Sequence, residues 1–493
     1  MSAEAPLFLM EDHCDAYPAW REVGASELIC VHLDAHLDLS DDGFPPSLLE
    51  RVQAARTPDE LRDLQANPRL PWGGYHAGNY LYPAMHDGTV SHLYWVIPPW
   101  LPRGVGLLDW VRSELQHWYQ VTLDDYASLH MSDGRVDGTV LGRPFTLCTL
   151  DRLPCFDEPV LLDIDVDYFL DHDDTLFAPP DEIAERVRER VPSPCAITVA
   201  YSVNGGYTPL ENRYVGDLVA RMAGGGLQDD VAASRAMRQG DDLRAGEHWD
   251  EALRAYGRAL DHGGIFAAPA LYKSSLALGL AGRHDGAALV AARAAELDGH
   301  YRPRALDIAF MWFRRRDHAR TLEWLARARA EDPLDGPLTL FIEGLAEMRA
   351  RNLSPAISAF ERLLDEPSLR PSERAHLSLA LSRALLAAGR AADAAAVARH
   401  AVALDENNGR GHLQLAHGLR GALLLDEAAR HYRKAIRLAG HTLGMLEAHE
   451  ALVALYEASG QKLLAAGEAR RLANKDVTGA FALRAALGQK GER

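Results

Sequence analysis

The chain has 493 residues, of which 47% are hydrophobic and 25% are charged, as expected for a globular protein of two or three domains. The formal net charge of −18 argues against nucleic acid as a partner, because nucleic acids bind basic surfaces. No apolar stretch approaches the roughly 18 residues of a membrane span, and the N-terminus lacks a basic start, so we expect neither a membrane segment nor a signal peptide.

The five cysteines fall in the first part of the chain, and none forms a Cys-x-x-Cys pair. They are Cys14, Cys30, Cys148, Cys155 and Cys195. An odd number of cysteines without metal-ligand spacing predicts reduced thiols, so we expect a cytoplasmic protein. The negative charge suits a cationic partner, such as a peptide that contains arginine.

The first predicted strand, Leu7–Met10, ends at the turn Glu11-Asp12-His13. A single histidine at a strand end is typical of a structural residue, and it predicts no site by itself. It gains meaning because two later predicted strands also end in aspartate or histidine side chains.

The second predicted strand, Leu28–Val31, leads into Asp34, His36 and Asp38. In extended backbone, residues two apart point to one side, so these three side chains would converge on one point. Two carboxylates and an imidazole that are crowded together repel and desolvate one another unless a cation lies between them. The stretch therefore predicts a divalent metal site, and a polar strand end with solvated aspartates is the alternative.

The third predicted strand, Pro159–Leu162, runs into Asp163, Asp165 and Asp167, again at a spacing of two. Carboxylates on one face of an apolar strand lack a structural reason, because buried carboxylates are normally paired or bound to metal. A solvated edge strand fits poorly, since the apolar run is typical of a strand that is buried on both faces. Three strand ends with such residues therefore predict one metal centre.

The residues Asp-Ala-His-Leu-Asp at 34–38 resemble the Asp-Ala-His-x-Asp motif of the arginase/ureohydrolase superfamily, and Asp-Val-Asp at 165–167 resembles its later Asp-x-Asp motif. With residues 78–84 and 94–98, roughly residues 5–220 look most like the uncharacterised-protein family of arginase-like domains. Some bacterial members are peptide arginases, which convert arginine residues of ribosomal peptides to ornithine. The resemblance implies an α/β arginase/deacetylase-like domain with a parallel sheet.

The resemblance further implies a binuclear manganese site with two Mn²⁺ ions per chain. By position, its ligands would be His13, Asp34, His36, Asp38, Asp165 and Asp167, with Asp34 and Asp165 as bridges. Asp163 replaces a small residue of the arginase pattern, so the later ligand pair could also be Asp163 and Asp165. We prefer Asp165 and Asp167, because Asp163 then takes the position of the usual serine and becomes a further or supporting ligand.

Carboxylates and imidazoles suit Mn²⁺ better than they suit metals that prefer thiolates. Two such ions can share a water and lower its pKa towards neutrality, and the hydroxide could attack a guanidinium carbon. Deacetylases of the same fold usually keep one metal and lack the third acidic residue of the run. Asp38 and His13 therefore favour two ions and guanidine hydrolysis.

The resemblance also implies a histidine that shuttles a proton, in a Gly-rich loop. His76, within Pro71–Asn79, matches best, and with Asp38 it is an expected catalytic residue. A histidine that caps the following helix is the alternative interpretation. Among these enzymes a late acidic residue binds the guanidinium, and Glu211, beyond the predicted strand Ala196–Ser202, is the nearest match.

Asp12 or Glu11 is the alternative to Glu211 as the substrate-binding acid. The loop Ser40–Pro46 lacks the residues with which free-arginine enzymes hold the α-carboxylate and α-amine. This departure favours an arginine residue inside a peptide as the substrate.

After Gly224–Gly226 the sequence becomes rich in Ala, Leu and Arg. A small, then large or apolar, then small pattern recurs at intervals of 35, 34, 35, 38 and 34 residues, starting at Ala252, Ala287, Thr321, Ala356, Ala394 and Ala428. The period resembles that of tetratricopeptide repeats, and the small residues let two helices approach closely. We expect about seven helix pairs, of which the last runs from about Thr442 to Ala473.

The predicted organisation is a catalytic domain of residues 1–228 and an all-α tetratricopeptide-type solenoid of residues 229–493. Such a solenoid binds extended peptides or proteins on its concave face, and a purely structural role is the alternative. The expected function is a manganese-dependent peptide arginase whose repeats recruit an arginine-containing precursor peptide and whose products are ornithine and urea. A non-catalytic repeat scaffold and a deacetylase-type amidohydrolase are the alternatives, and an oligomer remains open.

Overall fold

The computed structural model describes residues 5–39, 46–65, 74–102, 106–115, 121–172, 174–204, 206–223, 230–302, 305–314, 316–439 and 445–475. The chain forms two compact units. The first comprises Met1–Asp38, Gly88–Arg103 and Leu147–Pro333, and the second comprises Leu39–Asp87, Gly104–Thr146 and Leu334–Arg493. The predicted domain boundary between residues 228 and 229 lies outside the described residues, so it stays a prediction.

Eight strands form a sheet in the order β1-β8-β7-β2-β3-β6-β5-β4. They are β1 (Leu7–Met10), β2 (Leu28–Leu33), β3 (Val90–Ile97), β4 (His130–Ser132), β5 (Arg135–Val140), β6 (Arg143–Thr149), β7 (Val160–Asp165) and β8 (Ala196–Ala200). The strands β1, β8, β7, β2 and β3 pair in parallel. Because parallel neighbours run in one direction, their carboxyl ends meet at the same edge of the sheet.

The sheet as a whole is mixed, which corrects the expectation of a parallel sheet. Strands β4 and β5 pair antiparallel, with Ser132 opposite Arg135. Asp133 and Gly134 between them have φ angles of 50° and 78°, the left-handed pair that a two-residue hairpin turn requires. A chain that reverses within two residues lays the next strand antiparallel to the one before it.

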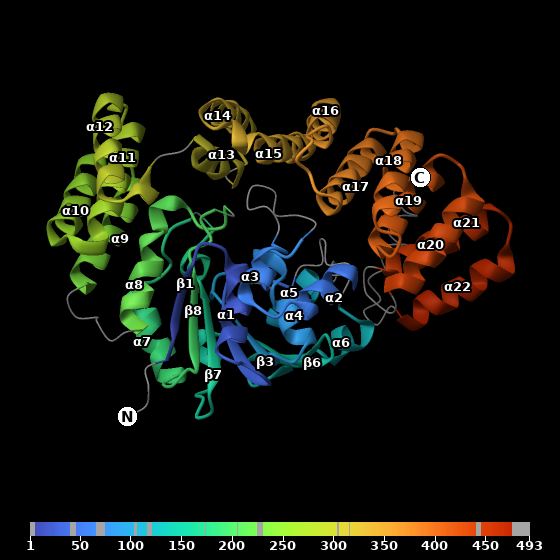
Figure 1. The fold of residues 1–493 in the computed structure, drawn as a ribbon, viewed down its shortest axis with the longest axis horizontal. Helices are drawn as coiled ribbons and strands as arrows, with labels where there is room; N and C mark the ends of the chain where they lie inside the picture. Colours follow the sequence, from blue (N-terminus) through green and yellow to red (C-terminus); the bar gives the residue numbers. More distant parts are fainter. Residues whose placement is uncertain are drawn as a thin grey trace. The chain divides into compact units, whose positions relative to one another are not determined.

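Helices α1 (Ala16–Glu22) and α8 (Tyr214–Ala223) cover opposite faces of β1 and β8 (Figure 1). Side chains alternate along β8, and Thr198 faces α1, where Nε1 of Trp20 donates to its hydroxyl at 3.4 Å. Ile197 and Val199 lie on the other face, in one buried core with residues of α8. The other helices before the repeats are α2 (Pro46–Ala54), α3 (Pro58–Arg62), α4 (Leu81–His86), α5 (Leu107–Leu115), α6 (Leu123–Ser128) and α7 (Pro180–Arg190).

Helices α9 to α22 follow one another as helical hairpins (Figure 1). They are α9 (Val231–Ala245), α10 (Trp249–His262), α11 (Ala267–Leu280), α12 (His284–Leu297), α13 (Ala305–Arg314), α14 (His318–Glu331), α15 (Gly336–Arg349), α16 (Leu353–Leu364), α17 (Pro371–Ala387), α18 (Ala391–Leu404), α19 (Gly409–Gly421), α20 (Leu425–Ala439), α21 (Leu446–Ala458) and α22 (Lys462–Lys475). The recurring sequence pattern falls on the second helix of each pair from α10 to α20. All three residues of the pattern are buried in α10, α14, α16, α18 and α20. In α12 only the last of the three, Ala294, is buried.

The predicted start of the last pair, Thr442, lies outside the described residues. Helices α9 to α14 belong to the first compact unit, and α15 to α22 belong to the second. In the part of the chain that the structure describes, no helix is long and apolar enough to cross a membrane.

Close packing between α9 and α10 predicts a difference between two glycines. A Cβ on Gly240 would lie 2.3 Å from a ring carbon of Tyr256, which is buried and donates its hydroxyl to Asp241 at 2.8 Å. Gly240→Ala should therefore lower the free energy of unfolding by about 1–3 kcal/mol, seen as a lower midpoint in urea.

Gly257→Ala is the matched control, because a Cβ on Gly257 of α10 would meet nothing within 4 Å. Alanine favours the helix over glycine by about 1 kcal/mol, so this midpoint should stay or rise. Equal midpoints for the two variants would contradict the packing described for α9 and α10.

Candidate metal centre

The predicted ligands of the first unit come together at the carboxyl edge of the parallel strands. His13 follows β1 in the 3-10 helix η1 (His13–Asp15), and residues 34–38 follow β2. Asp163 and Asp165 end β7, and Asp167 lies in the next 3-10 helix, η4 (Val166–Phe169). Strand direction alone therefore delivers side chains from three separate parts of the chain to one place.

Turns, as well as the pleat of β7, gather these residues. Strand β2 ends before Asp34, and Asp38 takes a left-handed φ of 50°. The Asp34 carboxylate accepts a hydrogen bond from the backbone N–H of His36 at 2.6 Å, and Asp165 accepts one from that of Asp167 at 3.1 Å. The expectation of extended backbone is wrong for residues 34–38, where the chain bends at the Asp34 carboxylate. It is confirmed for Asp163 and Asp165, which both lie in β7, but not for Asp167, which follows in η4.

The first group of side chains surrounds one ring nitrogen of His13. Nδ1 of His13 lies 3.3 Å from Oδ2 of Asp34, and 3.1 Å from an oxygen of Asp38 and from an oxygen of Asp165. Oδ2 of Asp34 is buried and accepts no hydrogen bond from any residue in the described ranges. Three oxygens and a nitrogen that face one another in a buried space fit the ligand sphere of a divalent ion.

The second group shares Asp34 with the first. Nδ1 of His36 lies 2.7 Å from Oδ2 of Asp167 and 3.6 Å from Oδ1 of Asp34. The side chain of His36 is 51% exposed, whereas Asp34 and Asp167 are buried. The two oxygens of Asp34 thus face two different groups, as expected for a carboxylate that lies between two ions.

Asp163 and His32 form a third group on the other side of His13. Asp163 lies 3.1 Å from Nε2 of His13 and 2.8 Å from Nδ1 of His32, and the hydroxyl of Thr198 donates to it. Asp163 therefore contacts the His13 nitrogen that faces away from the first group, which is the usual place of a carboxylate that orients a metal-binding histidine. This geometry favours the ligand register with Asp165 and Asp167.

His32 is a site residue that the sequence interpretation missed. Its side chain is fully buried, and its Nε2 lies 3.2 Å from the carbonyl oxygen of His36 and 3.4 Å from Oδ2 of Asp34. The available signal was its position directly after the predicted strand Leu28–Val31 and two residues before Asp34, which is the spacing of the other residues in the motif. A histidine inside a strand is ordinary in a protein core, so this signal was weak.

Mutual repulsion shapes the protonation of the carboxylates. Burial, together with the charges of Asp167, Asp38 and Asp165, raises the pKa of Asp34 to about 8. Burial and the charge of Asp167 also raise the pKa of Asp165. A divalent cation at this place would replace the proton that Asp34 otherwise holds at neutral pH.

The histidines balance part of the negative charge. Burial by itself lowers the pKa of His13, but the charge of Asp163 and the hydrogen bonds to Asp163, Asp165 and Asp34 together outweigh burial and hold that pKa well above its ordinary value. Burial by itself raises the pKa of Asp163, but His13 and His32 hold it below its ordinary value. In the same way His36 outweighs burial and lowers the pKa of Asp167.

His76 lies in the second compact unit, whereas the metal-ligand cluster lies in the first. It caps the 3-10 helix η2 (Ala77–Asn79), and its Nδ1 accepts a hydrogen bond from the backbone N–H of Gly78 at 3.1 Å. Its backbone N–H donates to Oδ1 of Asn79 at 2.9 Å. The capping role is thus present, and proton shuttling by His76 stays a prediction.

The predicted substrate-binding acids make other contacts. Glu211 forms a partly buried ion pair with Arg244 of α9, and its role as the substrate-binding acid stays a prediction. Glu11 pairs with Arg213. Asp12 accepts a hydrogen bond from the backbone N–H of Cys14 at 3.1 Å. Asp12 therefore stays next to His13 and the cluster.

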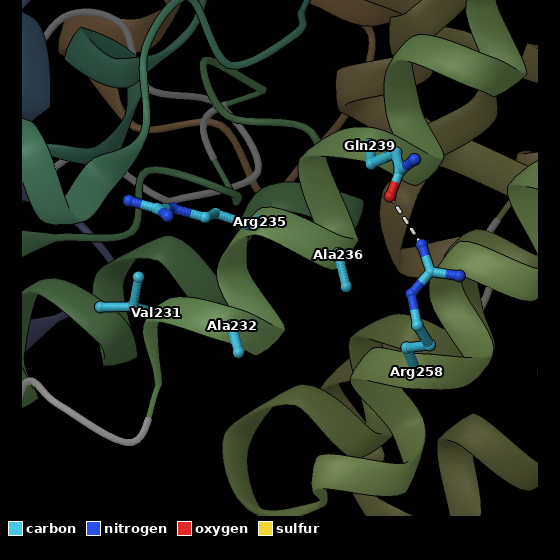
Figure 2. A pocket seen from close by; sticks show the side chains of 6 residues that line it. All are labelled: Val231, Ala232, Arg235, Ala236, Gln239 and Arg258. Atoms are coloured by element: carbon cyan, nitrogen blue, oxygen red, sulfur yellow. Dashed lines mark hydrogen bonds between the residues drawn. The ribbon is translucent and has the colours of Figure 1, made fainter.

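A separate pocket of about 470 Å³ lies on α9 and α10 (Figure 2). It is lined by Val231, Ala232, Arg235, Ala236, Gln239 and Arg258. Arg258 donates to the side-chain oxygen of Gln239 at 2.6 Å, and both arginines of the pocket are exposed. None of the predicted metal ligands lines this pocket.

No protein-family model and no curated protein matches the sequence. Among solved structures, the C-terminal part of a TPR repeat-containing protein from Cytophaga hutchinsonii is 15% identical, covering 50% of this chain and 98% of that chain with a TM-score of 0.35. MamA from Desulfovibrio magneticus RS-1 is 19% identical, covering 36% and 95% with a TM-score of 0.32. The Cut9–Hcn1 hetero-tetramer of APC/C is 16% identical, covering 54% and 51% with a TM-score of 0.27.

At these scores the likeness carries no argument about function, and the arginase-like prediction gains no support from it. The chain has a mostly helical structure with C-terminal helical hairpins, and an eight-stranded mixed sheet before them.

The place of Asp163 behind His13 predicts a graded loss of metal affinity. Asp163→Asn removes the charge that orients His13, so we expect Mn²⁺ affinity to fall by about 10- to 100-fold, measured by equilibrium dialysis with elemental analysis. Asp171→Asn is the control, because the Asp171 carboxylate accepts hydrogen bonds from the backbone N–H and the hydroxyl of Thr175, at 3.0 and 2.8 Å. If both variants bind Mn²⁺ like the unchanged chain, the orienting role of Asp163 is wrong.

Proposed function

We propose that this chain is a binuclear-manganese hydrolase of the arginase type, which converts arginine residues of a peptide to ornithine and releases urea. The observation that carries the proposal is that Asp34 directs one oxygen to the His13 group and the other to the His36 group. Hard oxygen and imidazole ligands around a shared carboxylate support two divalent ions. The Asp-Ala-His-Leu-Asp motif supports the arginase type.

His13, Asp34, Asp38 and Asp165 would hold one ion, and Asp34, His36, Asp165 and Asp167 would hold the other. When bound, the pair of ions would supply an activated water for attack on the guanidinium carbon. Ser202 donates its hydroxyl to Asp165 at 2.5 Å and so fixes the direction of that carboxylate. Asp163 fixes the ring of His13 in the same way.

The substrate would approach from the side of His36. Among the eight aspartates and histidines of the cluster, His36 alone is exposed, and the other seven are buried. A cationic guanidinium is attracted to the surplus of carboxylates there. The leaving amine of ornithine takes up a proton, and His76 is the proposed source of that proton.

A non-catalytic repeat protein that binds peptides or proteins is the second candidate. The succession of helical hairpins from α9 to α22 favours it, and nothing in the comparisons supports catalysis. A deacetylase-type amidohydrolase with one metal is a further alternative on the same predicted fold. Each candidate predicts a different product: none for a scaffold, a free amine and a carboxylate for a deacetylase, and urea for an arginase.

The arginines of the repeats would recruit the peptide by binding acidic residues of that peptide. Arg235 and Arg258 both line one pocket of a chain whose net charge is −18, with the Arg235 side chain pointing away from Arg258 and lying 4.0 Å from Asp181 (Figure 2). Guanidinium groups bind carboxylates through charge-assisted hydrogen bonds. An acidic segment of the peptide could therefore bind here while an arginine of the same peptide reaches the metal centre.

Incubation with Mn²⁺ and an arginyl peptide tests the catalytic proposal. We expect each converted residue to lose the mass of CN₂H₂ in mass spectrometry, together with release of one urea. Asp34→Ala should abolish this reaction, because the shared carboxylate is lost. A metal-loaded chain that converts no arginyl peptide would contradict the proposal, and so would full turnover by Asp34→Ala.

The pocket on α9 and α10 predicts a loss of peptide affinity. The double variant Arg235→Ala/Arg258→Ala should weaken binding of a fluorescent glutamate-rich peptide by about tenfold or more, as expected for lost hydrogen bonds between charged groups. The control is Arg283→Ala/Arg293→Ala, which removes the same charge from two exposed arginines that pair with Asp250 and Glu296. Similar losses in both double variants would show that only the net charge matters and would refute this pocket.

A further inference from the structure

A half-exposed aromatic ring lies at the open side of the metal-ligand cluster. Tyr207 follows β8, and its ring centroid lies 5.1 Å from that of His36, with the ring planes 68° apart. Tyr207 is 41% exposed, and the side chain of His36 is 51% exposed. The ring therefore stands where the cluster can be reached from solvent.

Charged side chains of both signs lie around this ring. The imidazole of His36 acts electrostatically on the Tyr207 hydroxyl, and the carboxylates of Asp38, Asp167 and Asp12 act on it in the opposite sense. An aromatic face next to several carboxylates suits a flat organic cation, because the ring binds its plane while the carboxylates balance its charge.

Backbone contacts tie Tyr207 to the cluster. The backbone N–H groups of Tyr207 and Thr208 donate to the carbonyl oxygen of Ser202 at 3.2 and 3.1 Å. Ser202 has a left-handed φ of 52°, and its hydroxyl donates to Asp165. One short turn thus holds both a carboxylate of the cluster and the exposed ring.

Helix α13 packs against the same turn. Gly206 has a φ of 78°, and a Cβ there would meet the ring of Phe310, on α13, at 3.1 Å. The backbone at Gly206 therefore packs closely against Phe310, and the contact that places the Tyr207 ring is the one with His36.

We propose that Tyr207 binds the guanidinium of the substrate by stacking its ring against the planar cation. This inference rests on the proposed function, and it gives the guanidinium an aromatic contact in addition to any acidic one. The same chain already stacks guanidinium groups on aromatic rings: Cζ of Arg213 lies 3.9 Å from the ring centroid of Tyr201, and that of Arg320 lies 4.1 Å from the ring centroid of Trp312.

The experiment uses the full chain loaded with Mn²⁺ and a blocked arginine, N-acetyl-arginine methylamide, as the probe. Affinity is measured by microscale thermophoresis within seconds of mixing, before turnover consumes the probe, and the metal content is measured by elemental analysis. We expect Tyr207→Ala to weaken probe affinity by about 5- to 30-fold, the range of a cation–π contact, with unchanged metal content. Tyr207→Phe keeps the ring and should stay within about twofold.

Trp324→Ala is the matched control. Trp324 lies on α14, and Cζ of Arg327 stacks on its ring at 4.3 Å from the centroid. The loss of this ring should therefore leave probe affinity unchanged. In turnover, Tyr207→Ala should raise KM more than it lowers kcat, because the contact binds the substrate before reaction.

Equal probe affinity in Tyr207→Ala and the unchanged chain would overturn this inference alone. Loss of metal from Tyr207→Ala would also overturn it, since the ring would then support the cluster rather than the substrate. If the unchanged chain holds Mn²⁺ but does not bind the blocked arginine, the proposed function falls together with the inference.

Discussion

The first unit depends on how it balances five aspartates that the sheet brings to one edge. Asp34, Asp38, Asp163, Asp165 and Asp167 would repel one another in a buried space, and the three histidines between them compensate only part of this charge. Asp34 lies at the centre of the remaining repulsion. The proposed pair of divalent cations would offset this repulsion and turn a destabilising arrangement into a binding site.

The helices that follow the sheet also support the site. Lys273 of α11 is buried, and its ammonium group lies 2.8 Å from both Asp241 and Asn212. Together with the Arg244–Glu211 pair, this contact anchors the first helical hairpins to the segment that follows Tyr207. Breaking one partner of a buried pair costs much more than a surface pair is worth, so these helices act as part of the site's scaffold.

Much of the site could be predicted because short apolar runs that end in aspartate or histidine mark the carboxyl ends of buried strands, as at Asp34 and Asp165. The small residues of the repeats could be predicted in the same way, because the spacing of close helix contacts is local. The hairpin after His130 was missed, although its Asp-Gly turn is a usable signal. The contacts of His32 and the ion pair of Glu211 depend on partners 131 and 33 residues away, which no local pattern specifies.

The number of metal ions per chain tests the central claim most directly. The full-length protein is loaded with Mn²⁺, dialysed, and measured for metal and protein by elemental analysis, next to Asp34→Asn, which keeps the size of the shared side chain. The account predicts two ions per chain and a loss of both in the variant, because Asp34 faces both groups. A single ion, or two ions that both remain in Asp34→Asn, would contradict it.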